Sequence, residues 1–376
     1  MLKVAILGAN GFIGSRTVEM LHLNGWAEVR PIVRTISNLA RLSRFDLDCR
    51  IADALNQSAL AEAFKGCDIV IHAVAGDRNT ILGSLAPTYL AAQDAGVTRL
   101  VYLSTASVHG QAPSPGTDEN SPLSNQQPID YNNTKVQAEQ QLLKLRDTGS
   151  VELVMLRPGI VFGARSYWTA SFAADLLAGK AYLVNEGKGI CNSIYIDNLV
   201  YAIYLASKAQ GADRQAFLVG DKEQITWSDF YRPIAAALGF ELSQIPSVTY
   251  TEIPPSLKDR IEIVLASKPS LAFLSLFPNK WRLAARAALE ALFQTPPPSP
   301  WTFPTPQKPT LPQPVATLEM ALLQQCQYKL PDAKARKILG YEPIISFEEA
   351  CRRSIGWLAF AGYPTIDAYK LPSNKL

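Results

Sequence analysis

The stretch KVAILGANGFIG, Lys3 to Gly14, decides the fold class of this 376-residue chain. A short apolar run leads into three glycines, after which a helix is expected to begin. Glycine permits a tight turn and a close approach of phosphate to the backbone, and a helix N-terminus presents free N–H groups to an anion. The stretch therefore predicts a dinucleotide-binding loop. A merely structural turn is the alternative, because the GxxGxxG spacing differs from the usual GxGxxG. The residues assigned to cofactor binding here are Gly8, Asn10, Gly11, Phe12, Ile13 and Gly14.

The residues after this loop alternate between short β-branched runs and helix-length amphipathic segments, up to about residue 160. The strand candidates are KVAIL, EVRPIV, CRIA, DIVIHAV, RLVYLS and VELVML. Such alternation predicts an α/β protein with a doubly wound parallel sheet that carries helices on both faces. The less regular second half predicts a smaller lobe.

The second half is expected to contain one strand within SIYIDNLVYAIYLA (193–206) and another in AFLVG. Residues 250–327 are interpreted as an insertion with two helix candidates, KDRIEIVLAS and KWRLAARAALEALF. Nine prolines between Pro296 and Pro314 favour a polyproline strap or a linker. The tail, residues 332–362, predicts two packed helices with a turn at Gly340.

Composition narrows the class of protein. Lys and Arg (36) nearly balance Asp and Glu (33), and the net charge of +3 does not favour a nucleic-acid partner. Five widely spaced cysteines without a CxxC pair and three histidines predict no disulfide framework and no metal site. The N-terminus lacks the pattern of a signal peptide, and no apolar run is long enough to span a bilayer. These features predict a cytoplasmic protein.

The cofactor type depends on the end of the second strand, EVRPIVRT. Arg34 occupies the position where a carboxylate would bind the ribose hydroxyls of NAD, and Arg30 is close in sequence. A guanidinium suits a 2′-phosphate, so NADP is favoured over NAD, and a solvated loop charge is the alternative. Asp53 after the third strand could accept a hydrogen bond from adenine or cap a loop. Small residues after the fourth strand would let a nucleotide lie against the backbone, or they could be core: Ala73, Val74 and Ala75.

A tyrosine and a lysine, Tyr131 and Lys135, begin the helical segment DYNNTKVQAEQQLLKL (130–145). Four residues apart, they lie on one helix face, either as a surface pair or as an acid–base group whose phenol pKa is lowered by the ammonium. The run LSTASVHG (103–110), at the end of the fifth strand, offers hydroxyls that can hydrogen-bond a substrate oxygen. His72, in an apolar strand, is interpreted as structural.

Together these motifs resemble the extended short-chain dehydrogenase/reductase family, of the NAD-dependent epimerase/dehydratase type. The segments that carry the resemblance are GANGFIG, DIVIHAVA, VTRLVYLSTASVHG, YNNTKVQAE, LRPGIVFG, IYIDNLVYAI and KILGYEP. The resemblance implies a Rossmann fold of seven strands, with the NAD(P)-binding domain at residues 1–163. Elements near 193–220 would return to that domain, and residues 164–376 would form a substrate-binding lobe.

The resemblance also implies site residues. Thr105 would be the catalytic hydroxyl, Tyr131 the acid–base group, and Lys135 would contact the nicotinamide ribose as well. The segment beside the nicotinamide would be Pro158, Gly159, Ile160 and Val161, and the substrate candidates are Ser107, Val108, Asn192 and Ser193. The implied reaction is hydride transfer between nicotinamide and a secondary alcohol or ketone of a small-molecule substrate.

Departures from the family pattern keep alternatives open. No arginine precedes IYIDN to grip a diphosphate, which disfavours a nucleotide sugar, and His109 stands where the family usually has tyrosine. The helix with Trp281, Arg282 and Arg286 is similar to elaborations of 3β-hydroxysteroid dehydrogenase-like members. It could cover an apolar substrate, make a peripheral membrane contact through residues 260–293, or only pack at the lobe or a homodimer interface. An epimerase or dehydratase that uses its cofactor transiently, and a non-catalytic NADP-binding sensor or scaffold, are the alternative functions.

Overall fold

A computed structural model describes residues 1–249 and 316–366 of the chain, which belong to one compact unit. Its centre is a seven-stranded sheet in the order β11-β6-β5-β4-β1-β2-β3, in which every neighbouring pair is parallel. The strands are β1 (Lys3–Leu7), β2 (Glu28–Val33), β3 (Arg50–Ile51), β4 (Ile69–His72), β5 (Arg99–Leu103), β6 (Glu152–Pro158) and β11 (Gln215–Val219). This sheet confirms the predicted fold class.

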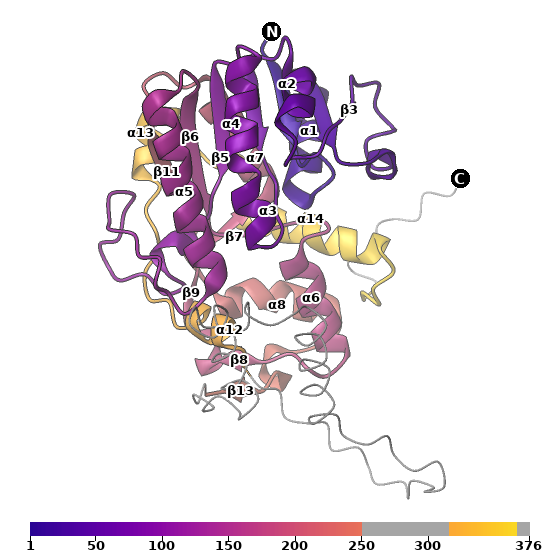
Figure 1. The fold of residues 1–376 in the computed structure, drawn as a ribbon. Helices are drawn as coiled ribbons and strands as arrows, with labels where there is room; N and C mark the ends of the chain where they lie inside the picture. Colours follow the sequence, from indigo (N-terminus) through magenta and orange to yellow (C-terminus); the bar gives the residue numbers. More distant parts are fainter. Residues whose placement is uncertain (250–315, 367–376) are drawn as a thin grey trace, which may run out of the picture. The chain divides into compact units, whose positions relative to one another are not determined.

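Helices cover both faces of the sheet (Figure 1). One face packs against α2 (Gln57–Phe64), α3 (Arg78–Gly83), α4 (Leu85–Asp94) and α5 (Asp130–Thr148); the other packs against α1 (Phe12–Leu23), α7 (Ile196–Lys208) and α13 (Ala333–Leu339). Alternate residues of a strand point to opposite faces, so a strand that is covered twice must be apolar throughout. In β1, Val4 and Ile6 belong to one layer and Ala5 and Leu7 to the other.

A third apolar core lies at the carboxyl ends of the strands and contains many aromatic rings, among them the stacked pair Phe172 and Tyr231. Figure 1 shows α6, α8 and α12 below the sheet. The elements here are β7 (Ile160–Phe162), α6 (Tyr167–Leu177), β8 (Leu183–Val184), β9 (Ile190–Cys191), β10 (Ser193–Tyr195), β12 (Ile225–Thr226), α8 (Trp227–Ala237), β13 (Ser247–Val248), α12 (Leu318–Leu323) and α14 (Phe347–Phe360). Short 3-10 turns complete the described chain at Ile36–Leu39, Ala106–His109, Asn185–Gly187 and Leu242–Gln244.

The strand predicted within 193–206 is β10, and the chain is helical from Ile196 onward because its buried apolar positions recur at the helical spacing 196, 199, 200 and 203. One prediction, that the two helices of the tail pack together, needs correction. The two tail helices do form on either side of Gly340, which has a left-handed φ of 69°. They pack on different cores, α13 beside the sheet and α14 in the third core.

The interpreted insertion lies mostly outside the described residues, including both of its helix candidates and its prolines. Residues 316–327 are described, and they contain α12, which packs through Leu323 into the third core. The membrane contact predicted for residues 260–293 also lies outside the described part. Within that part, no helix has the length and apolar character needed to cross a membrane.

Candidate active site

The glycine loop closes the crevice between β1 and β4, where the strand order reverses. Gly8 has φ 85°, and a Cβ there would lie 2.6 Å from the carbonyl oxygen of Ala73, just after β4. A Cβ on Gly14 would lie 2.2 Å from the oxygen of Gly8. Both positions therefore require glycine. Parallel sheets of this kind bind their ligands in the crevice at such a switch point.

The N-terminus of α1 suits a phosphate group. Gly11 is its N-cap, no side chain caps the helix, and its first turn carries no acidic residue. The free N–H groups of the first turn are therefore available to an anion, as the sequence predicted for residues 10–14. Ala73 and Val74, half-buried, and the exposed Ala75 follow β4 beside this loop.

Of the two arginines that the sequence places near the cofactor, Arg34 and Arg30, only Arg34 is available to it. Arg34 is exposed directly after β2. Arg30 is buried and bonds Asp48 (2.8 Å) and two backbone carbonyls, so it does not serve the cofactor site. Arg41, which the sequence analysis missed, donates to the carbonyl of Asn10 in the glycine loop (3.1 Å). Asp53 is exposed, and its Oδ1 accepts a hydrogen bond from the N–H of Leu55 (2.9 Å). This bond corresponds to the second role considered for Asp53, the capping of a loop. The other carboxylate oxygen takes no part in it.

Helix α5 carries the predicted tyrosine and lysine. The Lys135 Nζ is buried and donates to the carbonyl of Leu103 (2.8 Å), at the end of β5, and to the hydroxyl of Tyr102 (3.2 Å). Burial lowers the pKa of Lys135 to about 8, opposed by the nearby Glu139 carboxylate. Lys135 thus reaches the carboxyl edge of the sheet at Leu103, two residues before Thr105.

The expected effect of Lys135 on Tyr131 is not found in this structure. Desolvation, and after it the negative charge of Glu319, raise the pKa of Tyr131 above its ordinary value. Tyr131 is 45% exposed, so water screens part of this effect. The reason for the discrepancy is geometric: the ammonium donates its hydrogen bonds to β5.

Thr105 and its neighbours form a tight turn after β5. Thr105 is buried, and its hydroxyl accepts a hydrogen bond from the N–H of Ser107 (3.2 Å). Val108 is buried, and its carbonyl accepts from the amide of Gln127 (2.8 Å). Ser107 lines a pocket that is described below, so of the two predicted substrate residues in this turn only Ser107 faces such a space.

A buried ion pair joins the three segments that carry these residues. Arg157, the penultimate residue of β6, donates to both carboxylate oxygens of Glu139 on α5, at 3.0 and 2.6 Å, and the two side chains are 5% and 2% exposed. Ser104, which follows β5, donates to the same carboxylate. Arg157 also bonds the ring of His109 (3.1 Å), and burial with this positive charge lowers the pKa of His109 to about 4.

The buried His72 has the structural role expected of it. Its Nε2 lies 3.0 Å from the hydroxyl of Ser84, and burial with the charge of Lys135 lowers the His72 pKa to about 3. The imidazole is therefore neutral at physiological pH.

The predicted substrate residues Asn192 and Ser193 instead bond other parts of the protein. The Asn192 amide donates to the carbonyl of Tyr328 (3.0 Å) and accepts from the N–H of Leu330 (2.8 Å), which ties down the segment after α12. Ser193 donates to buried Asp221 (3.2 Å). The backbone carbonyl oxygen of Asn192 also accepts a hydrogen bond from the N–H of Ile160. A Cβ on Gly159 would lie 1.9 Å from the same oxygen.

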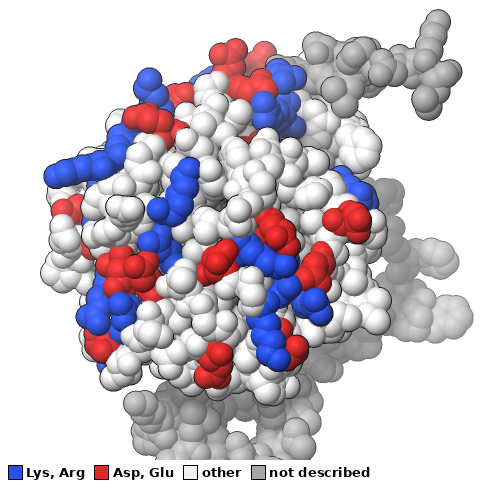
Figure 2. Space-filling model, turned by 90° about the horizontal axis from the view of Figure 1, so that it is seen from above, with Lys and Arg blue, Asp and Glu red and all other residues white. Residues whose placement is uncertain are grey.

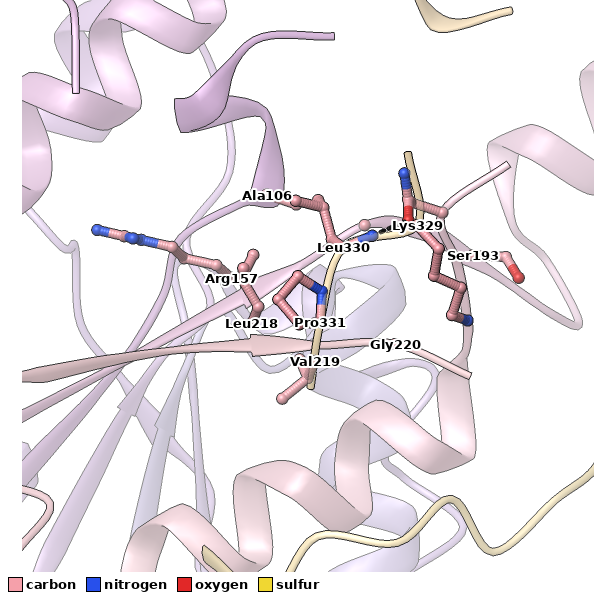
Figure 3. A pocket seen from close by; sticks show the side chains of 11 residues that line it. Ala106, Arg157, Ser193, Leu218, Val219, Gly220, Lys329, Leu330 and Pro331 are labelled. Carbon is pink, nitrogen blue, oxygen red and sulfur yellow. Dashed lines mark hydrogen bonds between the residues drawn. The ribbon is translucent and has the colours of Figure 1, made fainter. Parts of the chain in front are cut away.

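A small pocket lies between this segment and the ends of β6 and β11 (Figure 3). Leu330 and Pro331 lie beside Val219 of β11, and the Arg157 guanidinium points away from the pocket. Lys329 lines it, but its Nζ donates to the carbonyls of Asp221 and Glu223, both at 2.6 Å. Both cations are thus committed to the protein.

A second pocket adjoins the Thr105 turn and is largely apolar. It is lined by Ala106, Ser107, Gly110, Gln111, Pro113, Gly159, Ile160, Ile190, Asn192, Trp227, Leu323, Cys326 and Leu330. Gly159 and Ile160 belong to the segment predicted to lie beside the nicotinamide. Val161 continues that segment within β7, and Pro158 ends β6.

Sequence reasoning missed Gln111 and Glu319 beside this second pocket. Glu319, on α12, accepts a hydrogen bond from Gln111 Nε2 (3.2 Å) across 208 positions of sequence. It belonged to the interpreted insertion, so no local pattern could have connected it with Tyr131.

Metal and nucleic-acid ligands have no support in the described part of the chain. Its His, Cys, Asp and Glu residues form no group of three that could hold a metal ion. On the face that Figure 2 shows, basic and acidic side chains are interspersed.

The strand order and the uncapped glycine-loop helix at its switch point are typical of dinucleotide-binding proteins. The model of the NAD-dependent epimerase/dehydratase family matches residues 4–220, more than half of the chain, and the chain therefore belongs to this family. It is accordingly an enzyme of the extended short-chain dehydrogenase/reductase type, as its motifs predicted.

Relatives within this family differ in activity. A 3β-hydroxysteroid dehydrogenase/decarboxylase of Arabidopsis thaliana is 24% identical over 81% of this chain and 65% of its own length, so this chain spans less than two thirds of that relative. A 2-alkyl-3-oxoalkanoate reductase of Shewanella oneidensis is 24% identical over 93% of this chain and 84% of its own.

Solved structures share the fold. UDP-glucose 4-epimerase of Thermotoga maritima superposes with a TM-score of 0.66 at 17% identity, over 96% of this chain and 99% of that chain. The dTDP-glucose 4,6-dehydratase of Bacillus anthracis, in complex with NAD, has a TM-score of 0.67 at 14% identity, over 96% and 98%.

The buried ion pair generates a prediction about stability. Arg157→Met leaves Glu139 charged and buried without its partner, which should lower the free energy of unfolding by about 3–5 kcal/mol. The double variant Glu139→Leu/Arg157→Met should lose much less than the sum of the two single changes. Urea denaturation of all three variants measures the coupling.

Arg214→Met is the matched control, because Arg214 pairs with Asp147 at the surface, where loss of the pair should change stability by less than about 1 kcal/mol. An Arg157→Met variant no less stable than this control would contradict the role assigned to the buried pair.

Proposed function

We propose that the chain is an NAD(P)-dependent oxidoreductase that interconverts a secondary alcohol and a ketone of a small-molecule substrate. Thr105, Tyr131 and Lys135 would form its catalytic set. The observation that carries the proposal is the position of Lys135, with its ammonium buried 2.8 Å from the carbonyl of Leu103 at the carboxyl edge of β5. A buried ammonium at a ligand-binding edge is unfavourable unless it serves a function.

Each residue would have a separate role. The Thr105 hydroxyl would hydrogen-bond the substrate oxygen and hold the reacting carbon in place. Tyr131 would donate its proton to that oxygen during reduction and accept it back during oxidation. Lys135 would bind the ribose hydroxyls of the cofactor. The bound nicotinamide supplies or takes up the hydride.

The protonation state of Tyr131 is compatible with the reductive direction. A phenol is protonated at neutral pH even at its ordinary pKa, so Tyr131 begins a reduction with its proton in place; its raised pKa makes it a weaker acid, which would donate only as negative charge develops on the substrate oxygen. In the oxidative direction the same phenol needs a positive charge nearby, which an oxidised nicotinamide would provide.

The second pocket supports an apolar substrate. None of the described residues that line it is charged, and Trp227, Leu323 and Leu330 contribute large apolar surfaces. Relatives named as 3β-hydroxysteroid dehydrogenases and as a 2-alkyl-3-oxoalkanoate reductase are consistent with such a substrate. The alternative is a sugar or nucleotide-sugar epimerase or dehydratase, the activity named for several structural neighbours. The lack of an uncommitted cation in either pocket disfavours a diphosphate there.

NADP is proposed as the preferred cofactor. Arg34 is exposed at the end of β2, and Arg41 reaches the glycine loop through the carbonyl of Asn10. Among the described residues neither guanidinium forms an ion pair with a carboxylate, so both are free to bind a 2′-phosphate. The family itself is named for NAD, which is the alternative.

Tyr131→Phe tests catalysis, because it removes the proton that moves and leaves the ring in place. With any ketone that the wild type reduces, we expect the rate of NADPH consumption at 340 nm to fall by about 10²–10⁴-fold. Cofactor affinity should not change. Tyr167→Phe, at an exposed tyrosine of α6, is the matched control and should keep full activity.

Two outcomes would redirect the proposal. Unchanged activity in Tyr131→Phe would favour the non-catalytic sensor or scaffold. Product formation without any net change at 340 nm would favour the epimerase or dehydratase.

Arg34→Ala and Arg41→Ala test the cofactor preference. Each variant should lose NADP affinity by about tenfold or more, since a charge-assisted hydrogen bond is removed, and should keep its affinity for NAD. Calorimetric titration of both cofactors gives the ratio. Arg44→Ala is the control, because Arg44 is already paired with Glu19. An NADP-to-NAD ratio that is the same in all four proteins would refute the assignment.

A further inference from the structure

Gln111, in the wall of the pocket beside Thr105, and the exposed Glu319 that it contacts form a polar corner at this pocket. Gln111 lines the pocket and is only 7% exposed. Its Nε2 donates to Glu319 Oε1 at 3.2 Å. A carboxylate can only accept hydrogen bonds, so this contact fixes which end of the Gln111 amide faces Glu319.

The other end of that amide is unsatisfied. Gln111 Oε1 is buried and has no hydrogen-bond partner among the described residues. A buried acceptor without a donor is unfavourable, and such groups in folded proteins usually have a partner that is a ligand, a water or an ion. The position of Gln111 in the wall of a pocket makes a ligand the natural partner.

We propose that Gln111 and Glu319 form a specificity subsite that accepts a hydrogen bond from a hydroxyl group of the substrate and excludes a carboxylate or phosphate at that place. This inference rests on the proposed function, because it names the substrate class of the same site. The substrate would be an apolar ketone or alcohol with a second hydroxyl group away from its reacting carbon.

Three observations favour a hydroxyl over other groups. Gln111 Oε1 is a buried acceptor that needs a donor. None of the described residues that line the pocket is charged, so an isolated ammonium would be poorly solvated there. An anion would meet the negative charge of Glu319, and Lys329 and Arg157 are committed elsewhere.

The corner is also close to the reacting group. The charge of Glu319 acts on the phenol of Tyr131, whose pKa it raises together with desolvation. The other charged groups around Tyr131 are engaged: Lys135 bonds β5, and Arg78 bonds Thr134 and Asp130 of α5. The second hydroxyl of the substrate would therefore bind on the side of the site from which Glu319 acts on Tyr131.

Three matched ketones test the proposal: 4-methylcyclohexanone, 4-(hydroxymethyl)cyclohexanone and 4-oxocyclohexanecarboxylate. Their dissociation constants are measured by ligand-observed NMR, up to millimolar concentration, on the full chain saturated with oxidised cofactor so that no reduction occurs. We expect the hydroxymethyl compound to bind at least about tenfold more tightly than the methyl compound, and the carboxylate to bind most weakly.

Two variants assign these differences to the corner. Gln111→Leu should bring the ratio between the hydroxymethyl and methyl compounds close to one. Glu319→Gln should improve binding of the carboxylate by about tenfold, because the repelling charge is gone. Glu348→Gln, at an exposed residue of α14, is the control and should change nothing.

Failure of both the hydroxymethyl and the methyl compound to bind the wild type, or the same ranking in wild type, Gln111→Leu and Glu319→Gln, would overturn the inference. The outcome is separable from the proposed function. In one outcome, the wild type ranks the three ketones as expected and the two variants lose this ranking, while reduced cofactor never reduces the ketones. In that case the subsite stands and the oxidoreductase assignment fails. If ketones are reduced but the two variants leave the ranking unchanged, only the subsite fails.

Discussion

The arrangement of the candidate site depends on the buried pair of Arg157 and Glu139. Two charges that are almost completely removed from water are tolerated only when they are close to each other and fully hydrogen-bonded. Here the guanidinium holds both carboxylate oxygens, and Ser104 adds a third donor. The requirement for this geometry fixes β5, α5 and β6 relative to one another.

Each member of this network is adjacent to a residue of the proposed site. Ser104 precedes Thr105, Glu139 lies one helical turn after Lys135, and Arg157 precedes Pro158. Positions four apart on a helix share a face, so Glu139 and Lys135 approach the sheet together. The ion pair therefore positions the site through the backbone without itself contacting a substrate.

The electrostatics of the site depend on groups distant in sequence. Lys135 contacts β5 and keeps its charge away from Tyr131, whereas Glu319, nearly two hundred residues further along the chain, acts on the phenol. No described residue that lines the pockets offers an uncommitted cation, and under the proposed function this, with the carboxylate of Glu319, would favour neutral, hydroxyl-bearing substrates.

Much of the fold could be predicted because its signals are local. The apolar segments predicted strands that are covered on both faces, and the glycine loop predicted a tight turn. The structure has both features. The bounds of the strand predicted within 193–206 could not be given, because a short apolar run does not distinguish a strand from a buried helix. The side-chain partners of Lys135 and Asn192 and the contact between Gln111 and Glu319 could not be predicted, since they depend on tertiary packing between distant segments.

The most direct test of this account is a titration of the Tyr131 phenol, by NMR of chain labelled at the tyrosine ring carbons, with Tyr131→Phe used to assign the signal. Without cofactor, the account predicts a pKa above the ordinary value near 10. With oxidised cofactor bound, it predicts a clear decrease, because a positive charge then lies beside the phenol. A pKa that is unchanged by the cofactor would contradict the assignment of Tyr131 as the acid–base group.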